Sequence, residues 1–572
     1  MSSKKSADGA LLCMQRLWPY NAWHPAMVPT FPTLIQSLPA YTASAALPTV
    51  EITQVTADSR QVRPGALFVA VRGGAVDGHR FIADAIRRGA AAVVGTDVLT
   101  PETTEVVTTG GVPYVRVADS RAALARLAAA FYGYPSRQMR VVGVTGTDGK
   151  TTTSNLLYHL LSAAGLHPGM ISTVGARIGQ EALDTGLHVT TPDAPEVQRY
   201  LAQMRDAGCQ AAVLETTSHG LHQGRVAAVD FDVAVVTNIT HEHLDYHGTW
   251  EAYLEAKALL FRALGEATVK QVAEWGRSVR LIAGPTGPEG VQPKVAVLNA
   301  NDASYPHLRA IPADWTISYG LDDAAADVRA TDIVFEPART TFTAHTPAGQ
   351  ATVELPLPGR FNVYNALAAI SAGLALGLPL HGLAAAVATM PGVDGRMERI
   401  ERGQDFTAIV DFAHTPISLQ RALEAVRPMT SGRVIALFGS AGLRDVQKRS
   451  LMAEISLRLA DLTILTAEDP RSESLDLLLE QMAEGARRAG GVEGRNFLRI
   501  PDRTAAIAAA VEMARPGDVV IACGKGHEQS MCFGQVEHPW RDQAVLAWAL
   551  ERRLGKTDAA APFWLPTLGV GL

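Results

Sequence analysis

The chain has 572 residues, of which 47% are hydrophobic and 19% charged, a composition typical of an ordinary globular protein rather than a disordered or membrane-embedded one. Lys plus Arg total 51 against 57 Asp plus Glu, and this net charge of −6 argues against a bulk electrostatic attraction for nucleic acid. One hydrophobic core rarely supports so long a chain, so we expect three domains, and the sequence holds no run approaching the roughly 20 apolar residues that span a bilayer.

Residues 1–26 form an irregular N-terminal extension by their composition. The apolar run over 10–14 is too short for the core of a signal peptide. Met27 opens a segment that resembles a natural beginning, which leaves Met1 and Met27 as alternative translation starts. N-terminal mass spectrometry of the native protein decides between them, because peptides from 1–26 would reject a start at Met27.

The spacing of the four cysteines predicts the redox compartment. The cysteines are Cys13, Cys209, Cys523 and Cys532, and their spacing matches neither a zinc site nor a disulfide framework. We therefore expect a protein of the reducing cytoplasm.

Apolar runs alternate with Ala-rich helical patterns in the first segment, which is typical of an α/β layer. We expect strands over 65–71 and 91–95 and helices over 81–90 and 123–133. A turn at Tyr134-Pro135-Ser136 places the first boundary near residue 137, so the predicted first domain is 27–137.

The second segment, 138–395, continues the alternation with strands over 211–215 and 232–239 and a long helix over 364–378. The last segment, 396–572, has four apolar strands separated by helical patterns, as in a doubly wound sheet: 406–414, 433–439, 462–469 and 518–524. The predicted architecture is α/β in three domains, with a central P-loop domain of mostly parallel sheet and a Rossmann-like last domain. Residues 265–293 carry no motif, and we expect a surface elaboration of undetermined role.

The strongest motif is a Gly-rich loop between a strand over 139–146 and a helix over 151–165. Backbone N–H groups of such a loop bind phosphates, Lys150 contacts the outer phosphates, and Thr151 can ligate Mg²⁺. Val144 stands where the usual pattern has its first Gly, and a tight turn without nucleotide is the alternative. GKTT after an apolar strand is rare by accident, so we expect ATP at Gly146, Thr147, Asp148, Gly149, Lys150, Thr151 and Thr152.

Two further stretches carry candidate metal ligands. Glu215 ends an apolar strand, where a carboxylate beside a phosphate loop can hold Mg²⁺ or, alternatively, be an ordinary solvated strand end. The stretch 241–247 holds three His and two acids, a composition that also occurs at zinc sites. Magnesium is favoured because the phosphate loop already requires it.

The Gly-Thr-Asp-Gly-Lys-Thr-Thr loop resembles that of the Mur ligase and folylpolyglutamate synthetase superfamily, and matching motifs follow in order from about Met27 to Glu551. The resemblance implies a second metal ligand at His243 and a carbamylated lysine at Lys257, so that Lys150, Lys257 and His243 are the catalytic set. An unmodified Lys would repel a metal, whereas a carbamate is anionic; a surface Lys is the alternative. The resemblance also implies that Asn365 contacts the base, Arg396 the phosphates and Asp411 the ribose.

The first segment resembles the uridine-binding domain of the tripeptide synthetases (MurE type) within this family. The matching residues are Thr56-Ala57-Asp58-Ser59-Arg60 and the stretch 64–86. Thr217 stands where many members have Ser, which keeps a hydroxyl group. The resemblance implies that the UDP-sugar-peptide is bound by Ser59, Thr190, Thr191, Thr217, Gln223 and Arg225.

The last segment resembles the amino-acid site of the same group in the stretches 438–445, 468–471 and 524–528. This implies an amino-acid site at Arg444, Asp469, Arg471, Gly524 and Glu528. Leu443 occupies a position that is commonly Asp. Members that add meso-diaminopimelate typically have Asn at the position of Asp469, and the acid here favours a ligand with a terminal ammonium. Diaminopimelate, lysine and ornithine therefore all remain open.

The resemblance implies an ATP-dependent ligase that adds a third, diamino acid to UDP-N-acetylmuramoyl-L-alanyl-D-glutamate through an acyl phosphate. We expect small-molecule substrates, a monomer, and no nucleic acid or membrane partner. The alternatives are another amide ligase of the folylpolyglutamate or D-Ala-D-Ala-adding type, a P-loop ATPase or kinase without ligation, and a nucleotide-binding regulator without catalysis.

Overall fold

The structure, a computed structural model, describes most of the chain. The described residues are 28–43, 47–73, 76–179, 181–183, 190–240, 242–270, 291–336 and 339–567. The predicted extension over 1–26 and the second candidate start, Met27, lie outside them. The chain divides into two compact units, Met1–Gly133 and Tyr134–Leu572, each described by itself.

The first unit contains a five-stranded sheet in the order β1-β5-β4-β3-β2, parallel except for β1. Its strands are β1 (Thr42–Ala43), β2 (Gln54–Thr56), β3 (Ala66–Val69), β4 (Ala90–Gly95) and β5 (Tyr114–Arg116). Its helices are α1 (Phe31–Ile35), α2 (Ile82–Arg87), α3 (Pro101–Thr109) and α4 (Ser120–Phe131), with short 3₁₀ turns at Ser59–Gln61 and Gly78–Phe81. Successive residues of β3 face opposite sides of the sheet, so Leu67 and Phe68 enter different cores.

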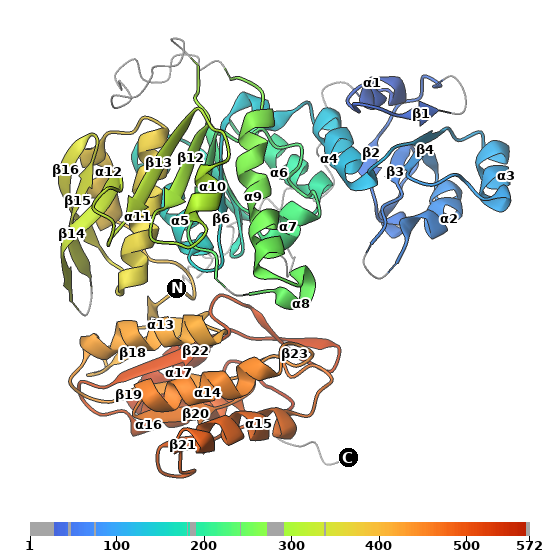
Figure 1. The fold of residues 1–572 in the computed structure, drawn as a ribbon. Coiled ribbons are helices and arrows are strands. Elements are labelled where there is room, and N and C mark those ends of the chain that lie inside the picture. Colours follow the sequence, from blue (N-terminus) through green and yellow to red (C-terminus); the bar gives the residue numbers. More distant parts are fainter. Residues whose placement is uncertain are drawn as a thin grey trace, which may run out of the picture. The chain divides into compact units, whose positions relative to one another are not determined.

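An eleven-stranded sheet, in the order β16-β15-β14-β13-β12-β11-β6-β10-β7-β8-β9, forms the first part of the second unit (Figure 1). The strands from β14 to β7 in that order are parallel, and antiparallel strands extend both ends. The strands are β6 (Arg140–Thr145), β7 (Pro168–Ser172), β8 (Gly175–Ile178), β9 (Glu181–Leu183), β10 (Ala211–Glu215), β11 (Val233–Val236), β12 (Val295–Asn299), β13 (Trp315–Gly320), β14 (Val328–Phe335), β15 (Thr340–Thr346) and β16 (Gly349–Leu355).

Helices cover both faces of this sheet, and its two cores hold alternate residues of the central strands. The helices are α5 (Lys150–Ala163), α6 (Ala194–Asp206), α7 (Ser218–His222), α8 (Leu244–His247), α9 (Trp250–Glu266), α10 (Tyr305–Arg309), α11 (Arg360–Ala375) and α12 (Leu380–Ala388). Helix α11 is apolar on nearly all sides and packs against α5, the helix that follows the phosphate loop (Figure 1).

The rest of the second unit contains a six-stranded sheet in the order β17-β18-β22-β19-β20-β21, parallel except for β17. Its strands are β17 (Glu398–Arg399), β18 (Thr407–Asp411), β19 (Val434–Phe438), β20 (Leu462–Leu465), β21 (Phe497–Arg499) and β22 (Val519–Cys523), and β23 (Ser530–Phe533) pairs with β24 (Val536–Pro539) in a hairpin. Its helices are α13 (Pro416–Val426), α14 (Gln447–Leu459), α15 (Leu475–Arg488), α16 (Arg503–Met513) and α17 (Asp542–Arg553), with a 3₁₀ turn at Arg427–Met429.

The predicted α/β class with mostly parallel sheets is confirmed. The four strands expected in the last segment correspond to β18, β19, β20 and β22, whereas the antiparallel strands at both ends of the large sheet and the β23–β24 hairpin were not foreseen. None of the helices in the described ranges is long and apolar enough to cross a membrane.

The segment expected as a surface elaboration, 265–293, is held to the core at its described ends, and 271–290 lie outside the described residues. Lys270 Nζ lies 2.5 Å from Asp232 Oδ2, and Lys294 Nζ lies 2.9 Å from Asp232 Oδ1. The Asp232 side chain is completely buried, and the Gln292 amide donates to the Lys270 carbonyl at 3.1 Å. Within the described ends of the segment, Lys270 and Gln292 are buried, whereas Gly265, Glu266, Thr268 and Val269 are exposed.

Candidate active site

The phosphate loop begins where β6 ends and requires glycine at two positions. Gly146 has φ +147° and Gly149 has φ +82°, and both conformations favour glycine. A Cβ at Gly146 would lie 1.9 Å from Thr237 Oγ1, and one at Gly149 would lie 2.2 Å from Asn365 Oδ1. The neighbouring side chains thus fill the space that other residues would need, and the loop lies tightly against them.

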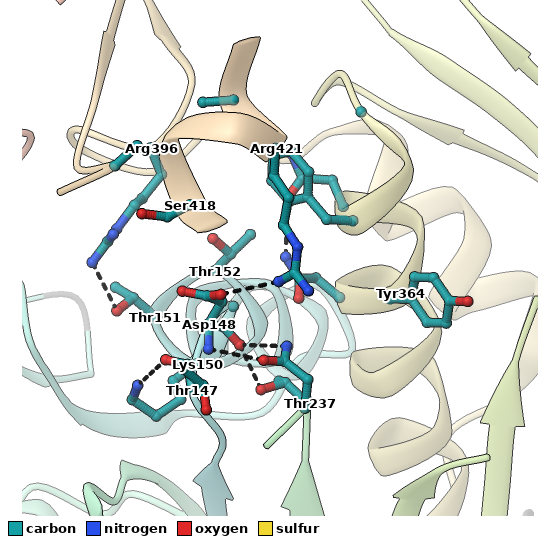
Figure 2. A pocket seen from close by; sticks show the side chains of 18 of the residues that line it. Thr147, Asp148, Lys150, Thr151, Thr152, Thr237, Tyr364, Arg396, Ser418 and Arg421 are labelled. Carbon is teal, nitrogen blue, oxygen red and sulfur yellow. Dashed lines mark hydrogen bonds and ion pairs between the residues drawn. The ribbon is translucent and has the colours of Figure 1, made fainter. Parts of the chain in front are cut away.

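The end of β11 fixes the backbone of the loop. The Asp148 amide donates to Asn238 Oδ1 at 3.1 Å, and the Asp148 carbonyl accepts from Asn238 Nδ2 at 3.0 Å and from Thr237 Oγ1 at 2.6 Å. Lys150 Nζ donates to the Thr147 carbonyl at 2.8 Å (Figure 2). The loop is therefore held in one conformation at the N-terminus of α5, which favours anion binding.

Glu215, at the C-terminal end of β10, lies beside the loop and is 1% exposed. Its Oε1 accepts from Thr151 Oγ1 at 3.0 Å and from Thr173 Oγ1 at 2.8 Å, and its Oε2 accepts from the Thr173 amide at 3.0 Å. One carboxylate and two hydroxyl groups form an all-oxygen set, which is the donor chemistry that Mg²⁺ prefers. These residues fit magnesium, and the alternative of a solvated strand end does not hold.

Lys257, on α9, lies behind the phosphate loop and is 1% exposed. Its Nζ donates to the Gly146 carbonyl at 2.6 Å and lies 4.5 Å from the centre of the Tyr253 ring. Burial, together with the charge of Lys150, holds the pKa of Lys257 well below its usual value. The surface-lysine alternative is thus excluded, and the neutral amine is favoured.

His243 is exposed at the edge of the same cavity and has a left-handed backbone, φ +55°. Its ring centre lies 4.8 Å from that of His219, and its Nε2 lies 3.9 Å from Glu242 Oε2. Burial raises the pKa of Glu242, and the charge of Lys150 acts in the opposite direction. A second acidic group therefore lies next to the predicted histidine ligand.

Arg396 reaches the phosphate loop from the last part of the chain, and Asp411 lines the same cavity. Arg396 Nη2 lies 3.3 Å from Thr151 Oγ1, and its guanidinium lies 4.2 Å from the centre of the Phe412 ring (Figure 2). Asp411 Oδ2 accepts from the Met397 amide at 2.7 Å. Burial lowers the pKa of Arg396 and raises that of Asp411. A buried guanidinium beside the loop is suited to a phosphate group.

These elements enclose a cavity of about 670 Å³. Most of the residues that the sequence predicted for nucleotide and metal line it, together with two from the predicted sugar-peptide set. They are Thr147, Asp148, Gly149, Lys150, Thr151, Thr152, Thr190, Glu215, Thr217, His243, Asn365, Arg396 and Asp411. Gly146 and Lys257 lie directly behind this lining, joined to each other by the hydrogen bond already described.

Asn365, predicted to contact the base, lines the cavity, and its side chain lies against the phosphate loop. Its Nδ2 donates to Asn362 Oδ1 at 3.0 Å, and its Oδ1 accepts from Thr153 Oγ1 at 3.4 Å. Tyr364, on the same helix, turns its hydroxyl toward Asn301 Oδ1 at 3.1 Å and Asp322 Oδ2 at 3.2 Å. This polar group also borders the cavity.

The residues predicted for the UDP-sugar-peptide lie in both units. Ser59 belongs to the first unit and is buried in a 3₁₀ turn. In the second unit, Arg225 Nη1 donates to the Thr191 carbonyl at 2.6 Å and Arg225 Nη2 to Gln223 Oε1 at 2.8 Å. The Thr191 and Thr217 hydroxyls lie 3.2 Å apart. Four of the six predicted residues thus form one connected network.

The predicted amino-acid site is built on two strand ends of the smaller parallel sheet. Asp469 and Arg471 both have left-handed backbones, φ +38° and +53°, and the Arg471 amide donates to the Cys532 carbonyl at 3.0 Å. Such conformations are costly for residues other than glycine and often occur at functional sites. Arg444 is exposed on its loop, and Gly524 has φ +108°.

Lys525 is a functional candidate that sequence reasoning did not select. Its side chain is 1% exposed, and its Nζ lies 2.8 Å from Asp469 Oδ1 and 2.5 Å from Glu528 Oε2. Asp469, which was expected to favour a ligand with a terminal ammonium, and Glu528 therefore already bind an ammonium of the protein. The motif around Lys525 is visible in the sequence, but the pairing is not.

Thr173, Asn238 and Arg421 were also not selected. Thr173 follows β7 and binds Glu215, while Arg421, on α13, pairs with Asp148 at 3.0 Å. Asn238 follows an apolar strand, a position that could have indicated a role at the sheet edge. The sequence offers no comparable indication for Thr173 or Arg421, since their partners lie 42 and 273 residues away.

Three family models match successive parts of the chain. The model described as the Mur ligase middle domain matches residues 144–282 and 288–373, the Mur ligase glutamate ligase domain matches 395–526, and the Mur ligase family catalytic domain matches 51–132.

Curated relatives are similar over most of the chain. A UDP-N-acetylmuramyl-tripeptide synthetase of Roseiflexus sp. (strain RS-1) is 47% identical, covering 87% of this chain and 94% of the relative. A UDP-N-acetylmuramoyl-L-alanyl-D-glutamate–2,6-diaminopimelate ligase of Geobacillus thermodenitrificans (strain NG80-2) is 41% identical, covering 88% and 96%. A solved structure of a ligase with the same name as the second is 30% identical with a TM-score of 0.63, covering 92% of this chain and 100% of its own.

Proposed function

The chain belongs to the Mur ligase family of ATP-dependent amide ligases, and from this premise we propose that it adds the third amino acid to UDP-N-acetylmuramoyl-L-alanyl-D-glutamate. The family uses ATP and Mg²⁺, and the cavity at the phosphate loop fits both. We infer that the sugar-peptide, a diamino acid and ATP are its substrates, and that it works as a monomer in the cytoplasm, where ATP is available.

One observation supports the proposal most strongly. The phosphate loop, the carboxylate of Glu215 and the guanidinium of Arg396 converge on one cavity, and the hydroxyl groups of Thr190 and Thr217 line that same cavity. A nucleotide site continuous with a site for a second polar substrate is what a phosphoryl-transfer ligase requires. The names of the relatives at 47% and 41% identity support the tripeptide step.

In the proposed reaction, the free side-chain carboxylate of the terminal D-Glu attacks the γ-phosphorus of ATP. The bond to the β–γ bridging oxygen breaks, so that an acyl phosphate and ADP form. The amine of the incoming amino acid then attacks the acyl carbon, loses a proton, and expels inorganic phosphate. Lys150 and Arg396 neutralise the charge that develops on the transferring group, where most of the catalytic effect of such enzymes lies.

Lys257 is proposed to act as a carbamate. Burial lowers the pKa of Lys257 and so favours its neutral amine, the form that is nucleophilic toward CO₂. The product would be an anion adjacent to the phosphate loop, able to orient magnesium together with Thr151, Glu215 and His243. Glu242 lies next to this group, and its raised pKa is consistent with several acids sharing one cation site.

The identity of the third amino acid depends on the charges around Asp469. Asp469 is an extra negative charge by its sequence, and in the structure Lys525 pairs with both Asp469 and Glu528, so this group of three charges keeps one net negative charge. Arg471 and Arg444 remain as cations that can bind carboxylates. This combination of charges can therefore bind an amino acid whose far end carries both an ammonium and a carboxylate, or one whose far end carries an ammonium alone. Diaminopimelate, lysine and ornithine are all candidates.

The decisive experiment is an assay of the purified chain with ATP, Mg²⁺ and UDP-N-acetylmuramoyl-L-alanyl-D-glutamate, to which diaminopimelate, lysine or ornithine is added separately. We expect product of the corresponding mass with one of them, and phosphate release that requires both the sugar-dipeptide and the amino acid. Phosphate release without an amide product would instead indicate an ATPase or kinase. Product from a UDP-sugar-tripeptide and D-Ala-D-Ala would indicate another step of the family.

A further inference from the structure

Asp148 places a negative charge inside the nucleotide cavity. It lies within the phosphate loop, lines the cavity, and its side chain is 28% exposed. The hydrogen bonds from Asn238 and Thr237 hold its backbone, so the carboxylate cannot leave the loop without breaking them. Because like charges repel, this carboxylate opposes the binding of a polyphosphate unless a cation compensates it.

The compensating cation comes from a distant part of the chain. Arg421 Nη1 lies 3.0 Å from Asp148 Oδ2, and Figure 2 shows the guanidinium extending from α13 across the cavity to the loop. Helix α13 is well anchored, because Thr415 and Ser418 form a capping box at its start and Leu419 and Leu423 are completely buried. Arg421 is therefore presented by a rigid element.

We propose that Arg421 is a positioning residue that neutralises Asp148, and that this pair couples nucleotide binding to the docking of α13 on the phosphate loop. The inference rests on nucleotide binding at this cavity, as proposed above. Docked α13 removes the repulsion between Asp148 and the phosphates. Conversely, a bound nucleotide favours the docked state by the same free energy, since coupling is reciprocal.

A second contact with the phosphate loop also comes from the last segment of the chain, outside α13: it joins Arg396 to Thr151. That contact does not involve Asp148, so it remains when the ion pair is removed. The two contacts can therefore be separated by mutation. The dependence on Arg421 should disappear when Asp148 loses its charge, whereas a purely structural role of Arg421 would not depend on that charge.

A double-mutant cycle on the full chain tests the coupling. The Kd of Mg²⁺–ATP is measured by calorimetry for the wild type, Arg421→Ala, Asp148→Asn and the double variant. We expect Arg421→Ala to weaken binding about tenfold when Asp148 is present and about twofold or less in the Asp148→Asn background. Arg427→Ala is the matched control, since Arg427 lies just beyond α13 and pairs with Asp461 instead of lining the cavity.

Equal losses in both backgrounds would overturn the proposal, as would unchanged binding in Arg421→Ala. Arg421→Gln replaces Arg421→Ala if circular dichroism shows that the latter does not fold. Hydrogen exchange is the second readout: ATP should slow exchange in α13 of the wild type and not in Arg421→Ala, and equal protection in both would contradict the coupling. Because these measurements need no ligation, their outcome is independent of which amino acid, if any, the chain adds.

Discussion

Lys525 Nζ lies within 2.8 Å of Asp469 Oδ1 and at 2.5 Å from Glu528 Oε2, so a single buried ammonium joins the two acids of the predicted amino-acid site. The same Asp469 oxygen accepts the Cys532 amide at 3.0 Å. Lys525 and the Cys532 amide therefore both hold Asp469, which lies two residues before Arg471. The charges of the protein itself therefore determine the shape of this site, and not only the charges of the ligand.

Lys525→Met is expected to leave two partly buried carboxylates without their cation. Breaking such a pair costs about 3 kcal/mol, and the loop should lose its geometry. We expect a larger increase in KM for the amino acid than for ATP, measured in the ligation assay, and a lower urea midpoint. Lys556→Met, at an exposed position, is the control; a KM for the amino acid that stays at the wild-type value in Lys525→Met would contradict this role.

Gly149→Ala is expected to abolish nucleotide binding. The added Cβ would lie 2.2 Å from Asn365 Oδ1, so either the loop or α11 must move. Gly165→Ala is a matched control, because Gly165 has a similar φ of +79° but no atom within 4 Å of the added Cβ among the described residues. The control should cost only about 1 kcal/mol of stability and keep its ATP affinity. Calorimetry with Mg²⁺–ATP measures the ATP affinity of both variants, and similar affinities for the two would argue against a tightly packed loop.

Lys257→Ala is expected to lower kcat by at least about 100-fold, since a charged group close to the transferring phosphate is lost. Lys257→Arg places a cation at this position and cannot form a carbamate, so it should be equally inactive. Added bicarbonate should have no effect on the wild type in air and should restore activity after CO₂ is removed. The ¹³C NMR spectrum of the protein in ¹³C-bicarbonate should show a carbamate signal that Lys257→Arg lacks. Full activity of either variant would exclude the carbamate.

Stability should fall as the pH falls below about 6.5, the usual pKa of histidine. Burial, reinforced by the charge of Arg396, lowers the pKa of His527 to about 3. Between these two values the unfolded chain binds a proton that the folded chain does not, so each pH unit costs about 1.4 kcal/mol for this residue. His527→Asn should show a shallower loss than the wild type in urea unfolding between pH 6.5 and 5. The exposed His381→Asn should follow the wild type, and identical slopes for all three would exclude the effect.

The sequence predicted those parts of the site that lie in continuous stretches. The phosphate loop, Glu215 at its strand end and the four central strands of the last segment follow from local patterns, because a parallel strand, a turn and a helix start have characteristic residues. The alternation also predicted the fold class. The antiparallel strands at the two ends of the large sheet were missed: β8 and β9 have only four and three residues, and β15 and β16 bury only alternate residues, so none forms a continuous apolar run.

Pairings between distant residues could not be predicted in this way. The charge of Asp469 was interpreted as available to a ligand, although Lys525, 56 residues further along, already binds it. Asn365 is predicted to contact the base, and the sequence gives no sign that its amide group also packs against Gly149. The burial of Lys257 likewise could not be predicted, since nothing in its helix distinguishes a buried lysine from an exposed one. Pairing and burial depend on which segments of the chain meet in the fold, and local sequence patterns do not contain that information.

The ion triad of Lys270, Asp232 and Lys294 has a practical consequence for protein engineering. Lys270 and Lys294, which flank the segment 271–290, both pair with the buried carboxylate of Asp232. The Gln292 amide also donates to the Lys270 carbonyl. These contacts hold the two flanks together and involve none of the residues 271–290. The entropy of closing a loop rises only slowly with its length. This position should therefore accept a reporter domain or an affinity tag without disturbing the nucleotide cavity, which makes it a suitable internal attachment point for labelling the enzyme.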